Sequence, residues 1–144
     1  MPAFPSVEWF NAVRDVFNRD EQYHGGGAGA CNAEVGIKVG DALFQLSFEG
    51  RDCAGATTIE SAQLRELDFY LDMEPAAWQA MIENIKTYGH ASLDYTLNTL
   101  DLDRDAGLCQ SATGDQYRAD MFFRFNQTFQ NYFDASTHID TSFS

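Results

Sequence analysis

The glycine run after His24 is the first segment whose residue types suit catalysis. His24-Gly25-Gly26-Gly27 has the pattern of the oxyanion loop of lipases and esterases, in which backbone N–H groups face a developing negative charge. The G-x-S-x-G elbow that carries the serine nucleophile of those enzymes occurs nowhere in the 144 residues. We therefore interpret the glycines as a connection between a helix and a hairpin.

An acidic segment is the second candidate. Asp101–Asp105 places three carboxylates at alternate positions, as at the start of an EF-hand calcium loop. That loop requires glycine at its sixth position and a bidentate glutamate at its twelfth, where this chain has Ala106 and Ala112. The sequence therefore predicts a solvated acidic turn, with a weak cation site as the alternative.

The other ionisable and nucleophilic side chains lack the spacing of a catalytic or metal centre. No two histidines have the i, i+4 spacing that places both imidazoles on one metal ion, and the three cysteines form no C-x-x-C motif. Asp68 and Asp72 alternate with Phe69 and Leu71, which places both carboxylates on the polar face of a strand. A base with a raised pKa inside an apolar pocket is the alternative. We expect no catalytic residue, no metal and no cofactor.

Charge and length narrow the class of protein. The 144 residues are the length of a single domain. Nine Lys and Arg against 22 Asp and Glu give the chain a formal net charge of −13. Nucleic acids and anionic membranes attract clustered positive charge, so neither is an expected partner, whereas an uncharged ligand is easily accommodated. Widely spaced, odd-numbered cysteines suit reduced thiols, and MPAFPSVEW does not resemble a signal peptide. We expect a cytoplasmic protein without stable membrane insertion.

The first half of the chain has the patterns of a helix and a β-hairpin. Apolar residues at helical spacing follow Pro5 and continue to about Phe17, with Ser6 as the N-cap. Alternating apolar residues then predict two strands joined by a Gly40-Asp41 turn. The predicted buried face of the hairpin comprises Val35, Ile37, Val39, Phe44, Leu46 and Phe48.

The middle of the chain predicts a strand that leads directly into a helix. Alternation gives a strand over residues 67–72, after a weaker strand near Ala56–Ile59. Pro75 suits the first turn of a helix that Gly89 ends, with Trp78, Met81, Ile82 and Ile85 at i, i+3, i+4 and i+7. A shorter helix with Leu93, Leu97 and Leu100 and a strand near Leu108–Ala112 complete this part.

The last third of the chain contains an apolar helical stripe. At about 100° per residue, the large side chains between Asp120 and Phe133 fall within roughly 120°. Burial of six such side chains represents roughly 9–18 kcal/mol, which an isolated helix cannot supply, so the helix must cover a solid or a hollow core. The stripe comprises Met121, Phe122, Phe125, Phe129, Tyr132 and Phe133, with Asn126, Gln127, Gln130 and Asn131 on the other side.

These elements predict an α+β domain with a mainly antiparallel sheet, in which residues 1–24 hold an N-terminal helix and residues 32–133 form the core. The hairpin EVGIKVGDALFQLSFEG, the strand and helix ELDFYLDMEPAAWQAMIENI and the terminal apolar helix follow one another as in the sterol carrier protein 2 (SCP2) family of lipid-binding domains. In that family a strand that ends in Asp leads into a helix with an aromatic residue near its start. Asp68 and Asp72 on the predicted strand and Trp78 on the helix resemble this pattern. The resemblance implies a five-stranded sheet covered by helices, with a tunnel for sterols, fatty acids or their CoA esters.

Two departures from the family affect the expected ligand. The glycine-rich and basic segment that follows the central helix in the family is replaced by the acidic TYGHASLDYTLNTLDLD, and no Ser-Lys-Leu ending is present. Few positive charges remain to meet the phosphates of CoA. An uncharged sterol-like or terpenoid ligand therefore fits better than an acyl-CoA.

We expect a protein that binds and carries an apolar lipid-like ligand, of the sterol, fatty acid or terpenoid class, and that is not an enzyme. Tyr132, Tyr70 and Asn126 are the candidates for orienting the ligand. One alternative is an interaction module whose apolar helical surface docks a partner protein or a second copy of the chain. Another is a small isomerase or hydratase acting on an apolar substrate. The residues expected to line the cavity are Phe69, Leu71, Trp78, Met81, Ile82, Phe122, Phe125, Phe129, Tyr132 and Phe133.

Overall fold

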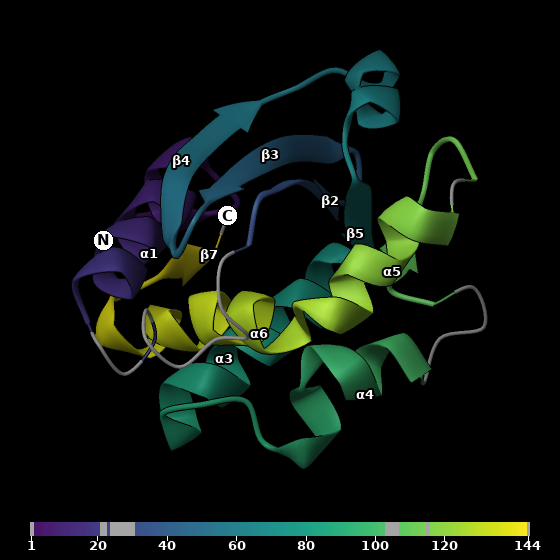
Figure 1. Ribbon diagram of the computed structural model, residues 1–144. Helices are drawn as coiled ribbons and strands as arrows, with labels where there is room; N and C mark the ends of the chain where they lie inside the picture. The colour runs from purple at the N-terminus through teal and green to yellow at the C-terminus, as the bar shows by residue number, and fades with distance from the viewer. Residues whose placement is uncertain (1, 21–22, 24–30, 103–106, 115, 144) are drawn as a thin grey trace.

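A five-stranded sheet forms one layer of the molecule, and helices cover one of its faces (Figure 1). The strand order is β4-β3-β2-β5-β6; β2 and β5 run parallel, and the other neighbouring pairs are antiparallel. The expected α+β fold with a mainly antiparallel sheet is confirmed. The strands are β2 (Ala33–Val39), β3 (Ala42–Glu49), β4 (Asp52–Thr58), β5 (Phe69–Met73) and β6 (Cys109–Gln110).

The computed structural model describes residues 2–20, 23, 31–102, 107–114 and 116–143. In this part of the chain, no helix is long and apolar enough to cross a membrane.

The hairpin of β2 and β3 forms where the alternation predicts it. Val39 pairs with Ala42 across the turn, and Gly40 has a φ of +60°, which glycine adopts without steric cost. Every second side chain of β2, β3 and β5 points toward the helices and, except for the half-buried Ala42, is buried, which gives the sheet one apolar face. That face comprises Ala33, Val35, Ile37, Val39, Phe44, Leu46, Phe48, Phe69, Leu71 and Met73.

The edge strand β4 begins earlier than the strand expected near Ala56–Ile59. Cys53 is the only β4 residue that is buried, so the strand lacks the apolar alternation that would reveal its start. Its position is set by a tertiary contact with α1 (Val7–Arg19). The amide of Asn18 donates from Nδ2 to the Cys53 carbonyl and accepts from the Cys53 N–H at Oδ1, each at 2.8 Å.

The first two long helices agree with the sequence. In α1, the Ser6 hydroxyl accepts a hydrogen bond of 3.1 Å from the Trp9 N–H, as expected of an N-cap. In α3 (Pro75–Tyr88), Gly89 ends the helix with a φ of +82°. Their buried faces comprise Trp9, Phe10, Val13, Val16 and Phe17 on α1 and Trp78, Met81, Ile82 and Ile85 on α3.

Short helices connect the longer elements. The 3₁₀ helix η1 (Ser61–Glu66) covers part of the outer face of the sheet, where a Cβ on Gly36 would lie 3.2 Å from Cδ2 of Leu64. Glycine at position 36 therefore permits this close approach. The expected third helix is present as η2 (Leu93–Tyr95) and α4 (Leu97–Leu102).

The single aromatic helix expected from Asp120 to Phe133 is wrong, because two helices occupy this segment. They are α5 (Gln116–Arg124) and α6 (Asn126–Asp134), with Phe125 between them at φ −110° and ψ 22°. The N–H groups of Thr128 and Phe129 both donate to the Phe125 carbonyl, which starts a new helical turn. The stripe therefore does not continue on one straight axis.

The two ends of the described chain pair with each other. After η3 (Ala135–His138), strand β7 (Ser142–Phe143) runs parallel to β1 (Ala3–Phe4), and the Ser142 N–H donates to the Pro2 carbonyl at 3.0 Å. Neither strand carries a periodic pattern that would predict it.

Candidate functional site

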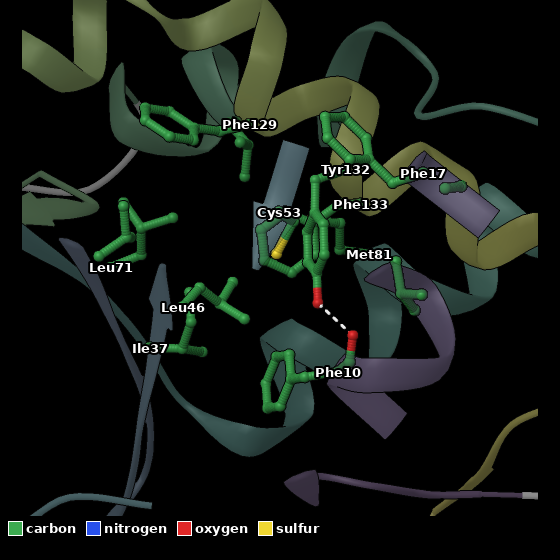
Figure 2. Packing of buried hydrophobic residues seen from close by; sticks show 14 of the residues in the cluster. Phe10, Phe17, Ile37, Leu46, Cys53, Leu71, Met81, Phe129, Tyr132 and Phe133 are labelled. Atoms are coloured by element: carbon green, nitrogen blue, oxygen red, sulfur yellow. Dashed lines mark hydrogen bonds between the residues drawn. The ribbon is translucent and has the colours of Figure 1, made fainter. Parts of the chain in front are cut away.

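The residues expected to line a cavity come together between the sheet and helices α3, α5 and α6. All of them belong to one hydrophobic cluster, and all but Phe125, which is half-buried at the helix break, are buried. Figure 2 shows Leu71, Leu46 and Ile37 from the sheet facing Phe129 and Tyr132 from α6. The structure therefore gathers side chains that lie more than 60 residues apart in the sequence.

Phe129 makes several of the aromatic contacts in this cluster. Its ring centroid lies 5.3 Å from Phe69 and 5.2 Å from Phe48, and its ring is stacked on Phe122 at 6.5 Å. On the α3 side, the Trp78 centroid lies 5.6 Å from Phe133. Such separations are typical of stabilising aromatic pairs. The predicted ligand-binding residues are thus also part of the core of the molecule.

The three polar groups expected to orient a ligand occupy different places. The Tyr132 hydroxyl is buried and donates to the Phe10 carbonyl at 2.8 Å (Figure 2). Tyr70 lies on the outer face of β5, beside Gly36 and away from the cluster. Asn126 is the first residue of α6. Among these three residues, Tyr132 and Asn126 are therefore on the helix that covers the cluster.

Two of the four polar residues predicted on the other side of the stripe, Gln130 and Asn131, are buried in α6, whereas Gln127 is exposed. Oε1 of Gln130 accepts a hydrogen bond of 2.7 Å from the Leu97 N–H, and Nδ2 of Asn131 donates to the Tyr23 carbonyl at 3.2 Å. Both side chains are buried. The reason is that α6 also contacts α4 and Tyr23, so these polar side chains are buried and hydrogen-bonded there.

The fold has a counterpart among solved structures. The crystal structure of sterol carrier protein 2 matches 94% of this chain and 98% of that chain, with a TM-score of 0.66 and 16% sequence identity. The chain has the SCP2 fold. No protein-family model and no curated protein sequence matches it.

The structural match covers 94% of the chain and so includes residues outside the range 32–133, on which the resemblance to SCP2 in the sequence was based. The terminal elements also contact the cluster. Phe17 of α1 lies 6.0 Å from Tyr132 and Phe4 of β1 lies 6.3 Å from Trp78, measured between ring centroids. The helical spacing in α1 signalled an apolar face but not its partner, and β1 has no periodic pattern, so Phe17 and Phe4 were missing from the predicted site.

A surface pocket of about 430 Å³ opens between α3 and the C-terminal segment of the SCP2 fold. Nζ of Lys86 donates to the carbonyls of Thr137 and Ile139 at 3.0 and 3.1 Å and pairs with Asp140 at 3.3 Å. Ile82 belongs both to this pocket and to the buried cluster, so the pocket reaches the core. Its lining comprises Ile82, Glu83, Lys86, Thr87, Asp140, Thr141 and Phe143.

Burial favours the neutral forms of three thiols and one phenol of the molecule. Burial raises the pKa of Cys31 to about 11 and the pKa values of Cys53 and Cys109 to about 12. Burial also raises the pKa of the Tyr132 hydroxyl well above its ordinary value. A raised pKa keeps a thiol or phenol neutral at pH 7, and the neutral forms are poor nucleophiles.

Three carboxylates that the sequence analysis considered, those of Asp68, Asp72 and Asp101, have structural partners. Oδ2 of Asp68 accepts from the Glu34 N–H at 2.7 Å, and Asp72 lies 3.9 Å from Lys38, as expected of a polar strand face. Oδ1 of Asp101 accepts from the N–H groups of Leu108 and Cys109 at 2.7 and 3.1 Å. Among the residues the structure describes, no three potential ligands cluster to hold a metal ion. The other acidic residues of that turn, and His24-Gly25-Gly26-Gly27, lie outside the described residues.

Proposed function

We propose that this protein binds and carries an apolar lipid-like ligand between its sheet and helices α3, α5 and α6. The observation that carries the proposal is the SCP2 fold, which extends over nearly the whole chain and over nearly the whole solved sterol carrier protein. The aromatic cluster supports it, because a sterol, fatty acid or terpenoid gains most of its binding energy from apolar burial.

Ligand entry requires the aromatic rings to separate, and the helix break supplies a place for this. Phe125 stands between two helices of nine residues each, so α5 can move relative to α6 without breaking a continuous helix. We propose that the cavity forms around Phe122 and Phe129 as the ligand enters.

The buried chemistry supports binding over catalysis as the role of this site. The thiols have raised pKa values, and the Tyr132 hydroxyl is engaged with a backbone carbonyl. All three cysteines are free, which supports our proposal of a reducing compartment such as the cytoplasm.

Native mass spectrometry with organic extraction of the freshly purified protein tests the proposal. A copurified lipid in a one-to-one complex is the expected result. A ligand-free protein that also fails to take up cholesterol, palmitic acid or a terpenoid alcohol from zwitterionic vesicles would refute the carrier role.

Trp78 provides a second readout, because it lies in the cluster with its ring beside Phe133. A Trp9→Phe variant leaves Trp78 as the single tryptophan. Its emission should change when one of these lipids is added. Unchanged emission at saturating lipid would remove Trp78 from the site.

A further inference from the structure

The surface pocket between α3 and the C-terminal segment is distinct from the aromatic cluster, although Ile82 belongs to both. On α3, Ile82, Glu83, Lys86 and Thr87 are spaced at i, i+1, i+4 and i+5, which places them on one side of the helix. Three residues of the segment 140–143 complete the lining. The volume of about 430 Å³ falls within the range of about 300–1,000 Å³ that is typical of small-molecule sites.

Apolar side chains supply part of this lining. Ile82 is 2% exposed and belongs to the hydrophobic core. Phe143 is half-buried and packs against that core, with its ring centroid 6.2 Å from that of Phe4. A ligand in this pocket therefore gains binding energy by burying an apolar body against Ile82 and Phe143.

The positive charge in the pocket is already engaged. The ammonium group of Lys86 has three protons to donate. Its Nζ donates to the carbonyls of Thr137 and Ile139 at 3.0 and 3.1 Å, and it lies 3.3 Å from Oδ1 of Asp140. These three acceptors match the three protons, so Lys86 is not available to an anionic ligand.

The hydroxyl groups of the lining are engaged as well. The exposed Thr87 hydroxyl donates to the Glu83 carbonyl at 2.9 Å within α3. Oγ1 of Thr141 accepts a hydrogen bond of 2.9 Å from Nε1 of Trp9. The lining side chains, all of which the structure describes, thus leave the Thr141 proton as their donor to a ligand.

Acceptors, by contrast, are in excess in this pocket. The Glu83 carboxylate is exposed, and no hydrogen bond or ion pair engages it within the part of the chain that the structure describes. The Asp140 side chain is 77% exposed and contacts Lys86 through Oδ1, which leaves Oδ2 for a second partner. Two carboxylates against one ammonium group give the pocket a net negative charge. A positively charged hydrogen-bond donor is therefore its chemical complement.

We propose that this pocket binds a small organic cation, with a primary ammonium group at one end and an apolar body at the other, as in an arylalkylamine. The ammonium group donates to the carboxylates of Glu83 and Asp140, while the apolar body lies against Ile82 and Phe143. The net charge of −13 favours the approach of such cations to the protein. This site and its ligand class are additional to the proposed carrier function.

The indole N–H signals in NMR spectra report on this pocket and on the aromatic cluster separately. The chain has two tryptophans. Nε1 of Trp9 donates to Thr141 at the pocket, whereas Nε1 of Trp78 donates to the Lys38 carbonyl at 2.9 Å. A Trp9→Phe variant assigns the two signals. We expect phenethylamine to shift the Trp9 signal in a saturable manner and to leave the Trp78 signal nearly unchanged.

Matched probes test the class of ligand. Phenylethanol has the same apolar body with a neutral hydroxyl group, and hydrocinnamate carries a negative charge. We expect phenethylamine to bind at least about tenfold more tightly than either probe, because charge-assisted hydrogen bonds are roughly twice as strong as neutral ones. Added salt should weaken the binding of the amine, since both carboxylates are exposed.

Variants of the two carboxylates test the position of the ammonium group. Glu83→Gln and Asp140→Asn should each weaken phenethylamine about threefold, and the double variant about tenfold, as expected for exposed ion pairs. The matched control removes two exposed carboxylates outside the pocket, in the Asp41→Asn, Glu74→Gln double variant. It should keep the wild-type affinity within about twofold.

Equal affinity for phenethylamine and phenylethanol would overturn the proposal. So would an equal loss of affinity in the control double variant, or an unmoved Trp9 signal at millimolar phenethylamine. The carrier function is tested separately, by copurified lipid and by the emission of Trp78, so either proposal can fail without the other.

Discussion

Phe122 and Phe129 stack on each other across the break between α5 and α6, with ring planes 2° apart and centroids 6.5 Å apart. In a straight helix, residues seven positions apart are separated by about 10 Å along the axis. The two rings are closer than this, and the helix is interrupted between them at Phe125. Both rings also lie against Phe69 of β5, at 5.8 and 5.3 Å. The break thus lets two aromatic residues of the covering helices contact the same strand residue.

Phe129→Ala should destabilise the protein strongly, because the ring is buried and contacts aromatic rings from β3, β5 and α5. We expect the free energy of unfolding to fall by about 3–5 kcal/mol in urea denaturation. Phe123→Ala is the control, since Phe123 is 51% exposed, and should change it by less than about 1 kcal/mol. If Phe129→Ala also lowered the free energy of unfolding by less than about 1 kcal/mol, the surroundings of Phe129 would be loosely packed in the ligand-free protein.

Thr128→Val should stabilise the ligand-free protein. The substitution replaces an unpaired, buried hydroxyl by a methyl group of similar size, which removes a desolvation penalty of about 1 kcal/mol. Urea denaturation of lipid-stripped protein measures the change, with Thr87→Val as the comparison. Destabilisation by Thr128→Val would indicate that the hydroxyl has a partner in the folded protein.

Lys86→Met should loosen the C-terminal segment, because Nζ holds the carbonyls of Thr137 and Ile139. Hydrogen exchange of the Ser142 N–H should accelerate at least about fivefold through local opening. The solvent-exposed ion pair between Lys86 and Asp140 contributes little, so Asp140→Asn should leave exchange near the wild-type rate. Equal exchange rates of the Ser142 N–H in Lys86→Met and the wild type would show that the pairing of β1 with β7 holds the C-terminal segment without Lys86.

Alkaline pH should destabilise the folded protein. The thiol pKa values of about 11 for Cys31 and about 12 for Cys53 and Cys109 lie above the ordinary value of 9.0, so the unfolded chain ionises first. The stability from neutral thiols is therefore complete below pH 9 and is lost as the pH rises toward these values.

Urea midpoints at pH 7 and pH 10 measure this effect, and Cys53→Ala should show a smaller fall than the wild type. At pH 8, a disulfide reagent should modify the native thiols at least about tenfold more slowly than the thiols of urea-unfolded protein. Equal rates would show that the cysteines are accessible in the folded state.

Local patterns were enough to predict the hairpin, strand β5 and helices α1 and α3. In each case one face is buried and the other is more exposed, so apolar residues recur with period 2 or 3.6, and a turn residue such as Gly40 or Gly89 marks the end. Only the second half of edge strand β4 was predicted, because its first half lacks apolar alternation and is held by hydrogen bonds from Asn18 of α1. The strands at the ends of the described chain were not predicted, because β1 and β7 depend on each other.

For the candidate site, the sequence by itself determined which apolar residues face inward and that they form one cluster. It also carried the order of elements that resembles SCP2. The tertiary structure decided that the covering segment is two helices, that Gln130 and Asn131 are buried, and that Tyr70 points away. The physical reason is that apolar periodicity in a sequence identifies only the face of a helix that packs on an apolar layer. Residues of α6 contact several layers at once, and only the assembled fold shows which polar atoms find partners and which, such as the hydroxyl of Thr128, do not.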